Sequence, residues 1–486
     1  MMPAMHELLD TFARVRRDCG DQPLVYRLDG PAWSATDLDG WASQLVLRLD
    51  ALGIPPRSPV VTALGNRAEF IAAVLACLQS NRPLLPADPG TTPDGVAALA
   101  ASFGAQAIVG IPAMLHGDGH RLSGEAELWL RGNIEARQYA GVSVLKVTSG
   151  STGLPKAVLA SADNLARDVE QIVAAMDIRP VDVQLGTIPL SHAYGLSNLV
   201  LPVLWQGTRV VLREGFVPQR LHDDVRAFGV RVWPAVPFMF EYLLAHEGPS
   251  LPPSLATLVS AGAPLLPAVV ERFHARYGRK VHSFYGTSET GGISFDGSDA
   301  VDRGGVGTPL RHARVTLRPV EGLDGPEGSG RVHVAGSAVG LGYSAGAESA
   351  DFCAGCFLTG DLGRFDAGGR LILTGRVSAF VNVAGRKVHP DEVAMHLREM
   401  PGVRDVRVVG APSASRGEQL VAILVPDGPA PSLLQVRRYC SARLPPHKIP
   451  RVLIVADTIP VDARGKTDRR RLEALVAAHV GSERAS

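Results

Sequence analysis

The chain has 486 residues, of which 46% are hydrophobic and 20% charged, and its formal net charge is +1. This length corresponds to about three domain-sized units, and the composition is typical of a globular protein. The near-neutral charge gives no electrostatic basis for binding nucleic acid, so we expect an enzyme that acts on small molecules.

The N-terminus and the cysteines bear on location. Residues 1–18 form an amphipathic segment with three acidic residues, so the uninterrupted apolar core of a signal peptide is missing. No apolar run approaches the length of a membrane span. Five cysteines, an odd number in a long chain, favour a reducing compartment over a disulfide framework. We therefore expect a cytoplasmic protein without a membrane-spanning segment.

The first 140 residues alternate between helical patterns and short apolar strands. Residues 60–64 form the clearest strand, and residues 69–78 follow as a helix. A strand followed by a helix indicates βαβ units and a mostly parallel sheet. Residues 84–90 contain two prolines and a glycine, which predicts a turn-rich loop.

A phosphate-binding pattern follows the apolar strand at residues 144–147. Residues 148–153 supply hydroxyls, small side chains and exposed amides, and Lys156 adds a positive charge. Backbone N–H groups, hydroxyls and a lysine together suit a polyphosphate. The spacing is not that of the common P-loop, because no Gly-Lys-Ser/Thr closes it. By itself, such a loop could equally be a solvated linker.

Further strands lead into loops that could line a pocket. The strand at 184–190 runs into His192 and Tyr194, where the histidine could contact a ligand or be purely structural. Strands at 208–212, 230–236 and 256–260 continue the alternation, and the last ends in a backbone-exposing turn, Gly262-Ala263-Pro264. Residues 280–284 lead into one short loop, 285–292, which combines a tyrosine, hydroxyls and a carboxylate suited to Mg²⁺.

From about residue 306 the pattern changes to short alternating strands at 313–317, 331–335, 357–358 and 370–374. This predicts a smaller antiparallel or barrel-like unit, with Asp361 between two strands and Arg376 at the end of the next. The remaining tail has strands at 406–409 and 420–425, helices at 390–400 and 432–444, and a polar loop at 461–468. It is long enough to form a separate domain.

Cys353-Ala354-Gly355-Cys356 is a CxxC pair. A redox or zinc role would need a thioredoxin-like βαβ setting or a second pair of ligands. The other three cysteines are scattered singly, so we expect neither a redox nor a zinc role.

Taken together and in order, these segments resemble the adenylate-forming superfamily, which includes acyl- and aryl-CoA synthetases, peptide adenylation domains and beetle luciferases. VTSGSTGLPKAV is similar to the family's phosphate loop, and PLSHAYGL to its aromatic acyl-pocket motif. SAGAPL and FYGTSETGG resemble its adenine and Mg²⁺ segments, LTGDLGRFDAGGRLILTGR its ribose segment, and PVDARGKTDRRRL its terminal lysine loop. The resemblance implies an α/β fold in two parts. Residues 1–376 would form a large AMP-binding domain of two layered α/β halves plus a small β-barrel, and residues 377–486 a small, mobile α+β domain that carries the lysine loop.

The resemblance also implies ATP and Mg²⁺ as ligands and assigns residues to them. The phosphates would be held by Thr148, Ser149, Gly150, Ser151, Thr152, Gly153 and Lys156. The adenine would be held by Gly262, Ala263, Pro264, Tyr285 and Gly286. Asp361 would accept both ribose hydroxyls, which suits an acceptor-only carboxylate, and Arg376 would assist. The catalytic residues would be Lys466, Thr287 near the α-phosphate, Glu289 on Mg²⁺, and His192.

The implied acyl pocket is apolar. Its candidate residues are His192, Tyr194, Trp233, Val236, Phe238, Ala261, Phe284 and Ile293. They include no Asp or Lys to pair with a substrate amine or a second carboxylate. We therefore expect an apolar monocarboxylic acid, aromatic or medium-chain, and poor use of amino acids.

Two further positions bear on the acceptor and on domain motion. Gly385 matches the glycine that lets the phosphopantetheine arm pass in thiol-using relatives. Ser378 stands where many relatives have an acidic hinge residue, so the hinge differs here.

The expected activity is that of a carboxylic acid–thiol ligase. The acid and ATP would give an acyl-adenylate and pyrophosphate, and a thiol of coenzyme A would then displace AMP. One alternative acceptor is a phosphopantetheinyl acyl carrier protein acting in trans. A second alternative is a nucleotide-binding regulatory protein without turnover, against which the retention of Lys156, Glu289, Asp361, Arg376 and Lys466 together argues.

Overall fold

The computed structural model describes most of the chain. Outside the described residues lie 1–4, 28–29, 113–119, 123–125, 132–133, 149–155, 302–303, 321–327, 345–349, 378–380, 384–385, 389, 414–416, 443, 461–466 and 484–486. The chain divides into two compact units. The first is Met1–Val315 with Val334–Phe357, and the second is Thr316–His333 with Leu358–Ser486.

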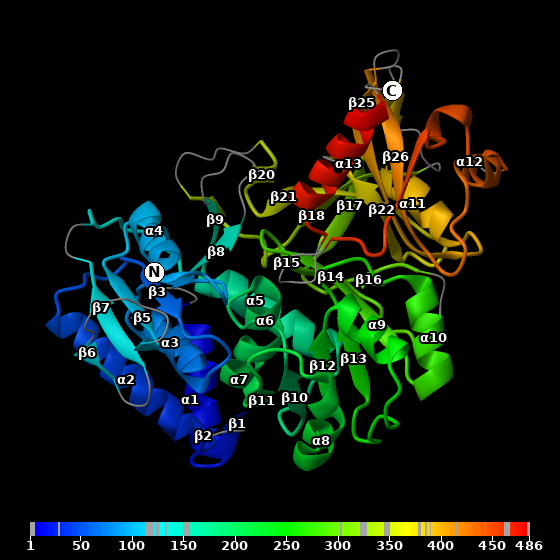
Figure 1. The fold of residues 1–486 in the computed structure, drawn as a ribbon. Coiled ribbons are helices and arrows are strands. Elements are labelled where there is room, and N and C mark those ends of the chain that lie inside the picture. Colours follow the sequence, from blue (N-terminus) through cyan, green and yellow to red (C-terminus); the bar gives the residue numbers. More distant parts are fainter. Residues whose placement is uncertain are drawn as a thin grey trace. The chain divides into compact units, whose positions relative to one another are not determined.

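The first unit contains an eight-stranded sheet of order β19-β9-β8-β4-β3-β5-β7-β6, drawn mainly in blue and cyan in Figure 1. Parallel pairing joins β3 to β4 and β5, and β4 to β8, whereas the outer pairs are antiparallel. The strands are β3 (Val60–Ala63), β4 (Leu84–Pro86), β5 (Ala107–Gly110), β6 (His120–Arg121), β7 (Glu127–Leu130), β8 (Val144–Thr148), β9 (Lys156–Ala160) and β19 (Gly342–Tyr343). The associated helices are α2 (Ala35–Ala51), α3 (Ala68–Gln79) and α4 (Pro93–Phe103).

The strand and helix expected at 60–64 and 69–78 are confirmed as β3 and α3, but the loop expected at 84–90 is partly wrong. Leu84, Leu85 and Pro86 form β4, all three buried. They pair with β3, and Leu84 also pairs with β8, so strand pairing on both sides outweighs the local turn signal of the prolines and glycine.

A nine-stranded sheet, also in the first unit, has the order β16-β15-β14-β13-β12-β10-β11-β1-β2. Its centre, from β1 to β14, is parallel, and its edges are antiparallel. The strands are β1 (Pro23–Arg27), β2 (Trp33–Ser34), β10 (Val183–Gly186), β11 (Arg209–Leu212), β12 (Val232–Ala235), β13 (Thr257–Ser260), β14 (Val281–Thr287), β15 (Gly291–Phe295) and β16 (Thr308–Pro309). The associated helices are α1 (Met5–Cys19), α5 (Ala162–Ala175), α6 (Ala193–Gly195), the π-helix η2 (Leu196–Val200), α7 (Leu201–Gln206), α8 (Pro218–Phe228), α9 (Pro237–Ala245) and α10 (Pro267–Tyr277).

Helix α5 illustrates how local sequence sets an element that the site needs. Ser161 is its N-cap, and a reciprocal pair of side-chain-to-backbone hydrogen bonds with Asn164 forms a capping box. Asn164 also donates to the backbone oxygens of Ser337 and Val339, at 2.8 and 2.9 Å. The cap thus joins the start of α5 to the chain segment that leads into β19.

A five-stranded sheet of order β17-β18-β21-β20, with β22 paired to β21, occupies the place where a barrel-like unit was expected. Its strands are β17 (Arg314–Arg318), β18 (Gly330–Ala335), β20 (Phe352–Cys353), β21 (Cys356–Phe365) and β22 (Leu371–Arg376). Asp361 lies inside β21 and not between strands, because β21 continues well beyond the short run expected at 357–358. It does so by pairing with β22 along Asp361–Phe365.

The second unit ends in a further sheet of order β24-β23-β26-β25, with β27 paired to β26. Its elements are β23 (Val381–Val383), β24 (Arg386–Val388), α11 (Pro390–Arg398), β25 (Val403–Ser413), β26 (Gly417–Pro426), α12 (Leu433–Ser441), the 3₁₀ helix η4 (Pro446–Lys448), β27 (Val452–Val455) and α13 (Arg469–Glu483). Buried Val406, Leu420 and Val436 belong to one apolar cluster of this region, which therefore has a core of its own.

Candidate functional site

The carboxyl ends of neighbouring parallel strands gather several predicted site residues. Strands β10, β12, β13 and β14 are adjacent and parallel, so their ends lie along one edge of the sheet. The segment containing His192 follows β10, Val236 follows β12, Gly262 follows β13, and Tyr285 lies towards the end of β14. In open α/β sheets, ligands bind at this edge.

His192 is the N-cap residue of α6, and its Nδ1 lies 3.2 Å from Oδ1 of Asp88. Asp88 follows β4 of the other sheet, so the pair joins the two sheets near the predicted site. Asp88 was not among the predicted site residues, although a carboxylate directly after a buried strand is a usable signal.

Tyr194 packs between two predicted pocket elements. Its ring stacks on Phe284 with a centroid distance of 5.9 Å, and its hydroxyl donates to the backbone oxygen of Val259 at 3.3 Å. Burial raises the pKa of the Tyr194 hydroxyl, so this residue stays neutral. The next residue must be glycine, because a Cβ on Gly195 would lie 2.0 Å from the oxygen of Pro189.

The remaining candidate pocket residues differ in exposure. Trp233 is fully buried, and its indole N–H donates to Oγ1 of Thr187 at 2.9 Å. Ala261, Phe284 and Ile293 are also buried, and Val236 is partly buried. Phe238 is 40% exposed and meets the ring of Phe216 edge to face. The structure therefore places Phe238 at the surface of the first unit.

The adenine-assigned turn and the Mg²⁺-assigned segment have different structures. Gly262 has a φ of +81°, which favours glycine, and it is exposed together with Ala263 and Pro264. The expected loop at 285–292 is instead a β-hairpin, because β14 continues to Thr287 and pairs with β15 from Gly291. Gly286 has no room for a side chain, since a Cβ there would lie 2.6 Å from the oxygen of Gly291.

Glu289, in the turn of this hairpin, is held by a residue that the sequence analysis missed. The hydroxyl of Tyr343 donates to Oε1 of Glu289 at 2.7 Å. Nζ of Lys156 lies 3.8 Å from the centroid of the same tyrosine ring. Burial, and then the negative charge of Glu289, raise the pKa of the Tyr343 hydroxyl, so it remains a donor. Thr148 lies opposite Lys156 in the β8–β9 pairing.

A buried carboxylate beneath the hairpin was also missed. Oδ1 of Asp168 accepts the backbone N–H of Gly292 at 2.8 Å, and Oδ2 accepts the hydroxyl of Ser197 at 2.6 Å. Burial lowers the pKa of the nearby Lys146 ammonium, and the charges of Asp168 and Glu289 oppose that shift. Asp168 lies in the middle of α5 among the buried residues Leu165 and Val169, and a charged residue on an otherwise apolar helix face is the signal that could have identified it.

Asp361 and Arg376 face each other on β21 and β22 of the second unit. Nε of Arg376 donates to Oδ1 of Asp361 at 2.6 Å. The backbone N–H of Asp361 donates to Oγ1 of Thr359 at 3.1 Å. Asp361 is 7% exposed, so its carboxylate has a defined orientation, which a ribose acceptor needs. The remaining predicted residues lie outside the described part of the chain, as does Ser378. They are Ser149, Gly150, Ser151, Thr152, Gly153, Gly385 and Lys466.

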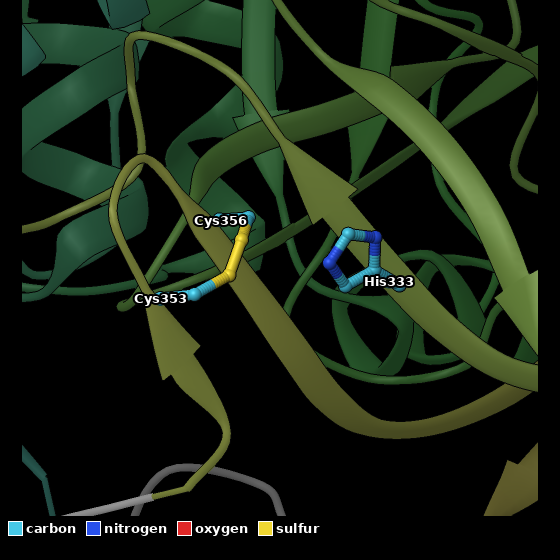
Figure 2. Close-up of side chains that lie close together, drawn as sticks. All are labelled: His333, Cys353 and Cys356. Atoms are coloured by element: carbon cyan, nitrogen blue, oxygen red, sulfur yellow. A yellow bond between two sulfur atoms is a disulfide. The ribbon is translucent and has the colours of Figure 1, made fainter.

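Cys353 and Cys356 form a disulfide that closes the tight hairpin between β20 and β21, as Figure 2 shows with His333 of β18. This disulfide was not expected from the sequence. Residue proximity explains it, because the two cysteines are directly opposed in the antiparallel pairing, with Cα atoms 5.0 Å apart.

The described helices include none that is both long enough and apolar enough to cross a membrane.

A layered α/β fold with several predicted site residues at one sheet edge is typical of nucleotide-binding enzymes. A family model described as AMP-binding enzyme matches residues 12–344, and one described as AMP-binding enzyme C-terminal domain matches residues 392–466. The chain therefore belongs to the AMP-binding enzyme family, within the adenylate-forming superfamily.

Relatives and solved structures agree with this family. An indoleacetate–CoA ligase from Aromatoleum aromaticum is 28% identical over 475 residues, which cover 91% of this chain and 93% of the relative. An oxalate–CoA ligase from Arabidopsis thaliana is 29% identical, and the match covers 68% of this chain but only 66% of that relative's length. The structure of the amide bond synthetase McbA from Marinactinospora thermotolerans matches with a TM-score of 0.83 and 26% identity, covering 97% of this chain and 99% of that chain. The chain thus resembles AMP-forming ligases over most of its length, and it spans about two thirds of the length of some of the relatives that it matches.

Proposed function

We propose that this chain activates a carboxylic acid with ATP and transfers the acyl group to the pantetheine thiol of coenzyme A. The observation that carries the proposal is the grouping of Lys156, Tyr343 and Glu289 beside the segment assigned to the phosphates. A lysine ammonium suits phosphate oxygens, and a carboxylate oxygen suits Mg²⁺. Oε2 of Glu289 makes no hydrogen bond to any residue that the structure describes, so this oxygen is available to coordinate Mg²⁺.

In the first half-reaction, a carboxylate oxygen attacks the α-phosphorus, the bond to the bridging α–β oxygen breaks, and pyrophosphate leaves. In the second, a thiol sulfur attacks the acyl carbon and AMP leaves, while the thiol proton is released. Mg²⁺ would neutralise phosphate charge at Glu289. Thr287 would donate to the α-phosphate, and Lys156 and Thr148 would bind the phosphates with residues 149–153. Asp361, oriented by Arg376, would accept the ribose hydroxyls.

The two half-reactions are proposed to use different faces of a mobile domain, residues 377–486. Lys466 would stabilise charge at the α-phosphate during adenylation, an electrostatic contribution of about 10²–10³ in rate. Gly385 would line the thiol path after the domain rotates. Lys466→Ala should therefore slow pyrophosphate release but spare thioester formation from supplied acyl-adenylate, and Gly385→Leu should do the reverse. Equal loss of both half-reactions in Lys466→Ala would reject domain rotation without rejecting ligase activity.

The proposed substrate is an apolar monocarboxylic acid, with an aromatic acid favoured over a medium-chain one. Support comes from the stacked rings of Tyr194 and Phe284 and from the neutral state of Tyr194, which offers no charge to a second polar group. The relative named for indoleacetate agrees with this choice, whereas the relative named for oxalate does not, so the names of relatives alone leave the acid open. The cytoplasm, where ATP and coenzyme A occur, remains the proposed location.

The test is pyrophosphate release by the full chain with ATP, Mg²⁺ and a panel of acids, first without and then with a thiol acceptor. Aryl acids should give release, and amino acids should not. Coenzyme A and a phosphopantetheinyl carrier protein are compared as acceptors in thioester formation. Transfer only to the carrier protein would identify the carrier protein, and not coenzyme A, as the acceptor. No release with any acid, despite measurable ATP binding, would favour a regulatory nucleotide-binding protein.

A further inference from the structure

Tyr343 lies at the meeting point of three chain segments in the first unit. In the sheet, Lys146 of β8 and Tyr343 of β19 are both paired with Val158 of β9. Directly paired residues of an antiparallel ladder share a face of the sheet, and so do residues two apart on one strand. Lys156, two residues before Val158, therefore shares the face of Tyr343, which agrees with its position over the tyrosine ring.

The segment around Tyr343 holds Glu289 at two points. The backbone N–H of Gly340 donates to the backbone oxygen of Glu289 at 2.8 Å, and the Tyr343 hydroxyl donates to its Oε1 at 2.7 Å. Gly340 cannot carry a side chain at this position, because a Cβ would lie 2.9 Å from both the oxygen of Leu159 and a methyl group of Val158. Backbone and side chain of Glu289 are thus both oriented from the same short segment.

The ring of Tyr343 is itself supported. Phe352 packs against it edge to face with a centroid distance of 5.0 Å, and Phe352 also packs on Phe357 at 4.5 Å. Together with Lys156 on the ring, these contacts fix the direction of the hydroxyl toward Glu289.

We propose that Tyr343 is a positioning residue that aligns the metal-binding carboxylate of Glu289 with the phosphate-binding ammonium of Lys156. This inference rests on the proposed function, because it takes Glu289 as the Mg²⁺ ligand and Lys156 as a phosphate ligand. The hydroxyl occupies Oε1 of Glu289, which would leave Oε2 to bind the metal, and the ring holds Lys156 through a cation–π contact. The two functions use different parts of one side chain, so substitution can separate them.

The experiment measures binding of α,β-methylene-ATP to the full chain by calorimetry, with Mg²⁺ and with EDTA. Tyr343→Phe keeps the ring and removes the hydroxyl. Its metal-free affinity should stay within about twofold of wild type, while the increase in affinity produced by Mg²⁺ should fall about tenfold, as expected for one charge-assisted hydrogen bond. Tyr343→Leu should lose the same metal increment and also weaken metal-free binding about threefold, because Lys156 loses the ring.

Two further variants separate the possible failures. Tyr277→Phe removes a hydroxyl that donates to the oxygen of Leu243 at 3.1 Å, away from the site, and should leave both affinities unchanged. Glu289→Gln tests the metal assignment itself. If Glu289→Gln abolishes the Mg²⁺ increment but Tyr343→Phe keeps it, the positioning proposal is wrong. If Glu289→Gln also keeps it, the metal assignment in the proposed function is wrong. Thermal unfolding of each variant identifies any that lose the fold. If Tyr343→Leu does not fold, the test rests on Tyr343→Phe, which retains the packed ring.

Discussion

Replacing Asp168 with alanine should destabilise the first unit strongly, because this carboxylate is 1% exposed and joins three elements. It accepts the N–H of Gly292 on β15 and the hydroxyl of Ser197 on η2, and it lies near the buried ammonium of Lys146 on β8. In Asp168→Ala both donors lose their acceptor and Lys146 loses a counter-charge. Breaking a buried, hydrogen-bonded charge in this way costs about 3–5 kcal/mol.

The measurement is thermal unfolding at a fixed scan rate. For a unit of this size, about 2 °C is lost per kcal/mol, so the unfolding midpoint should fall by about 6–10 °C. The matched control is Asp163→Ala on the same helix, where the side chain is 47% exposed and its carboxylate lies 3.8 Å from Arg167. That change should cost about 0.5 kcal/mol or less. A midpoint for Asp168→Ala that falls no further than that of Asp163→Ala would refute the argument that this buried carboxylate joins the three elements.

Three other outcomes are expected. Gly195→Ala should lower the unfolding midpoint and raise the KM for the acid several-fold, because its Cβ would lie 2.0 Å from a backbone oxygen. Gly248→Ala, where a Cβ would have nothing within 4 Å, should change neither value. Similar values for the two variants would contradict the steric argument. Burial raises the pKa of the Cys77 thiol to about 12, so in the folded chain this thiol should stay protonated and resist alkylation from pH 7 to pH 9. The partly exposed Cys19 should react under the same conditions. Mass spectrometry that finds Cys77 labelled before Cys19 would contradict this prediction. Asp361→Ala should raise the KM for ATP and weaken AMP binding in calorimetry, and unchanged nucleotide affinity would remove the ribose assignment.

Much of the fold could be predicted from the sequence because its signals are local. The strand at 60–64 and the helix at 69–78 follow from apolar periodicity, and the structure confirms both. The loop expected at 84–90 was wrong at its start, since pairing with two neighbouring strands is a non-local effect. The loop expected at 285–292 was wrong for the same reason, as its hairpin depends on contacts with α5, far away in sequence.

The candidate site shows the same division. Glu289 and Lys156 could be selected from motif and charge, and the structure brings both to Tyr343, where Glu289 meets the hydroxyl and Lys156 lies over the ring. Tyr343 could not be selected, because its proposed function depends on β19 pairing with β9, which no local pattern reveals. Asp88 and Asp168 were missed likewise, since their partners are more than twenty residues away in the chain. The roles assigned to Lys466, Gly385 and residues 149–153 stay predictions.

The two oxygens of Asp168 serve different parts of the enzyme, and this limits how the enzyme can be redesigned. Oδ2 holds Ser197, three residues after Tyr194 of the proposed acyl pocket, and Oδ1 holds Gly292, three residues after Glu289 of the proposed metal site. A Cβ on Gly291 would lie 2.4 Å from Oδ1, so this position of the hairpin accepts only glycine while Asp168 keeps its place. Substitutions that enlarge the pocket by displacing η2 would therefore also disturb nucleotide use. Directed evolution toward a bulkier acid should be more successful on the side of Val236 and Phe238, which no contact described here links to Asp168.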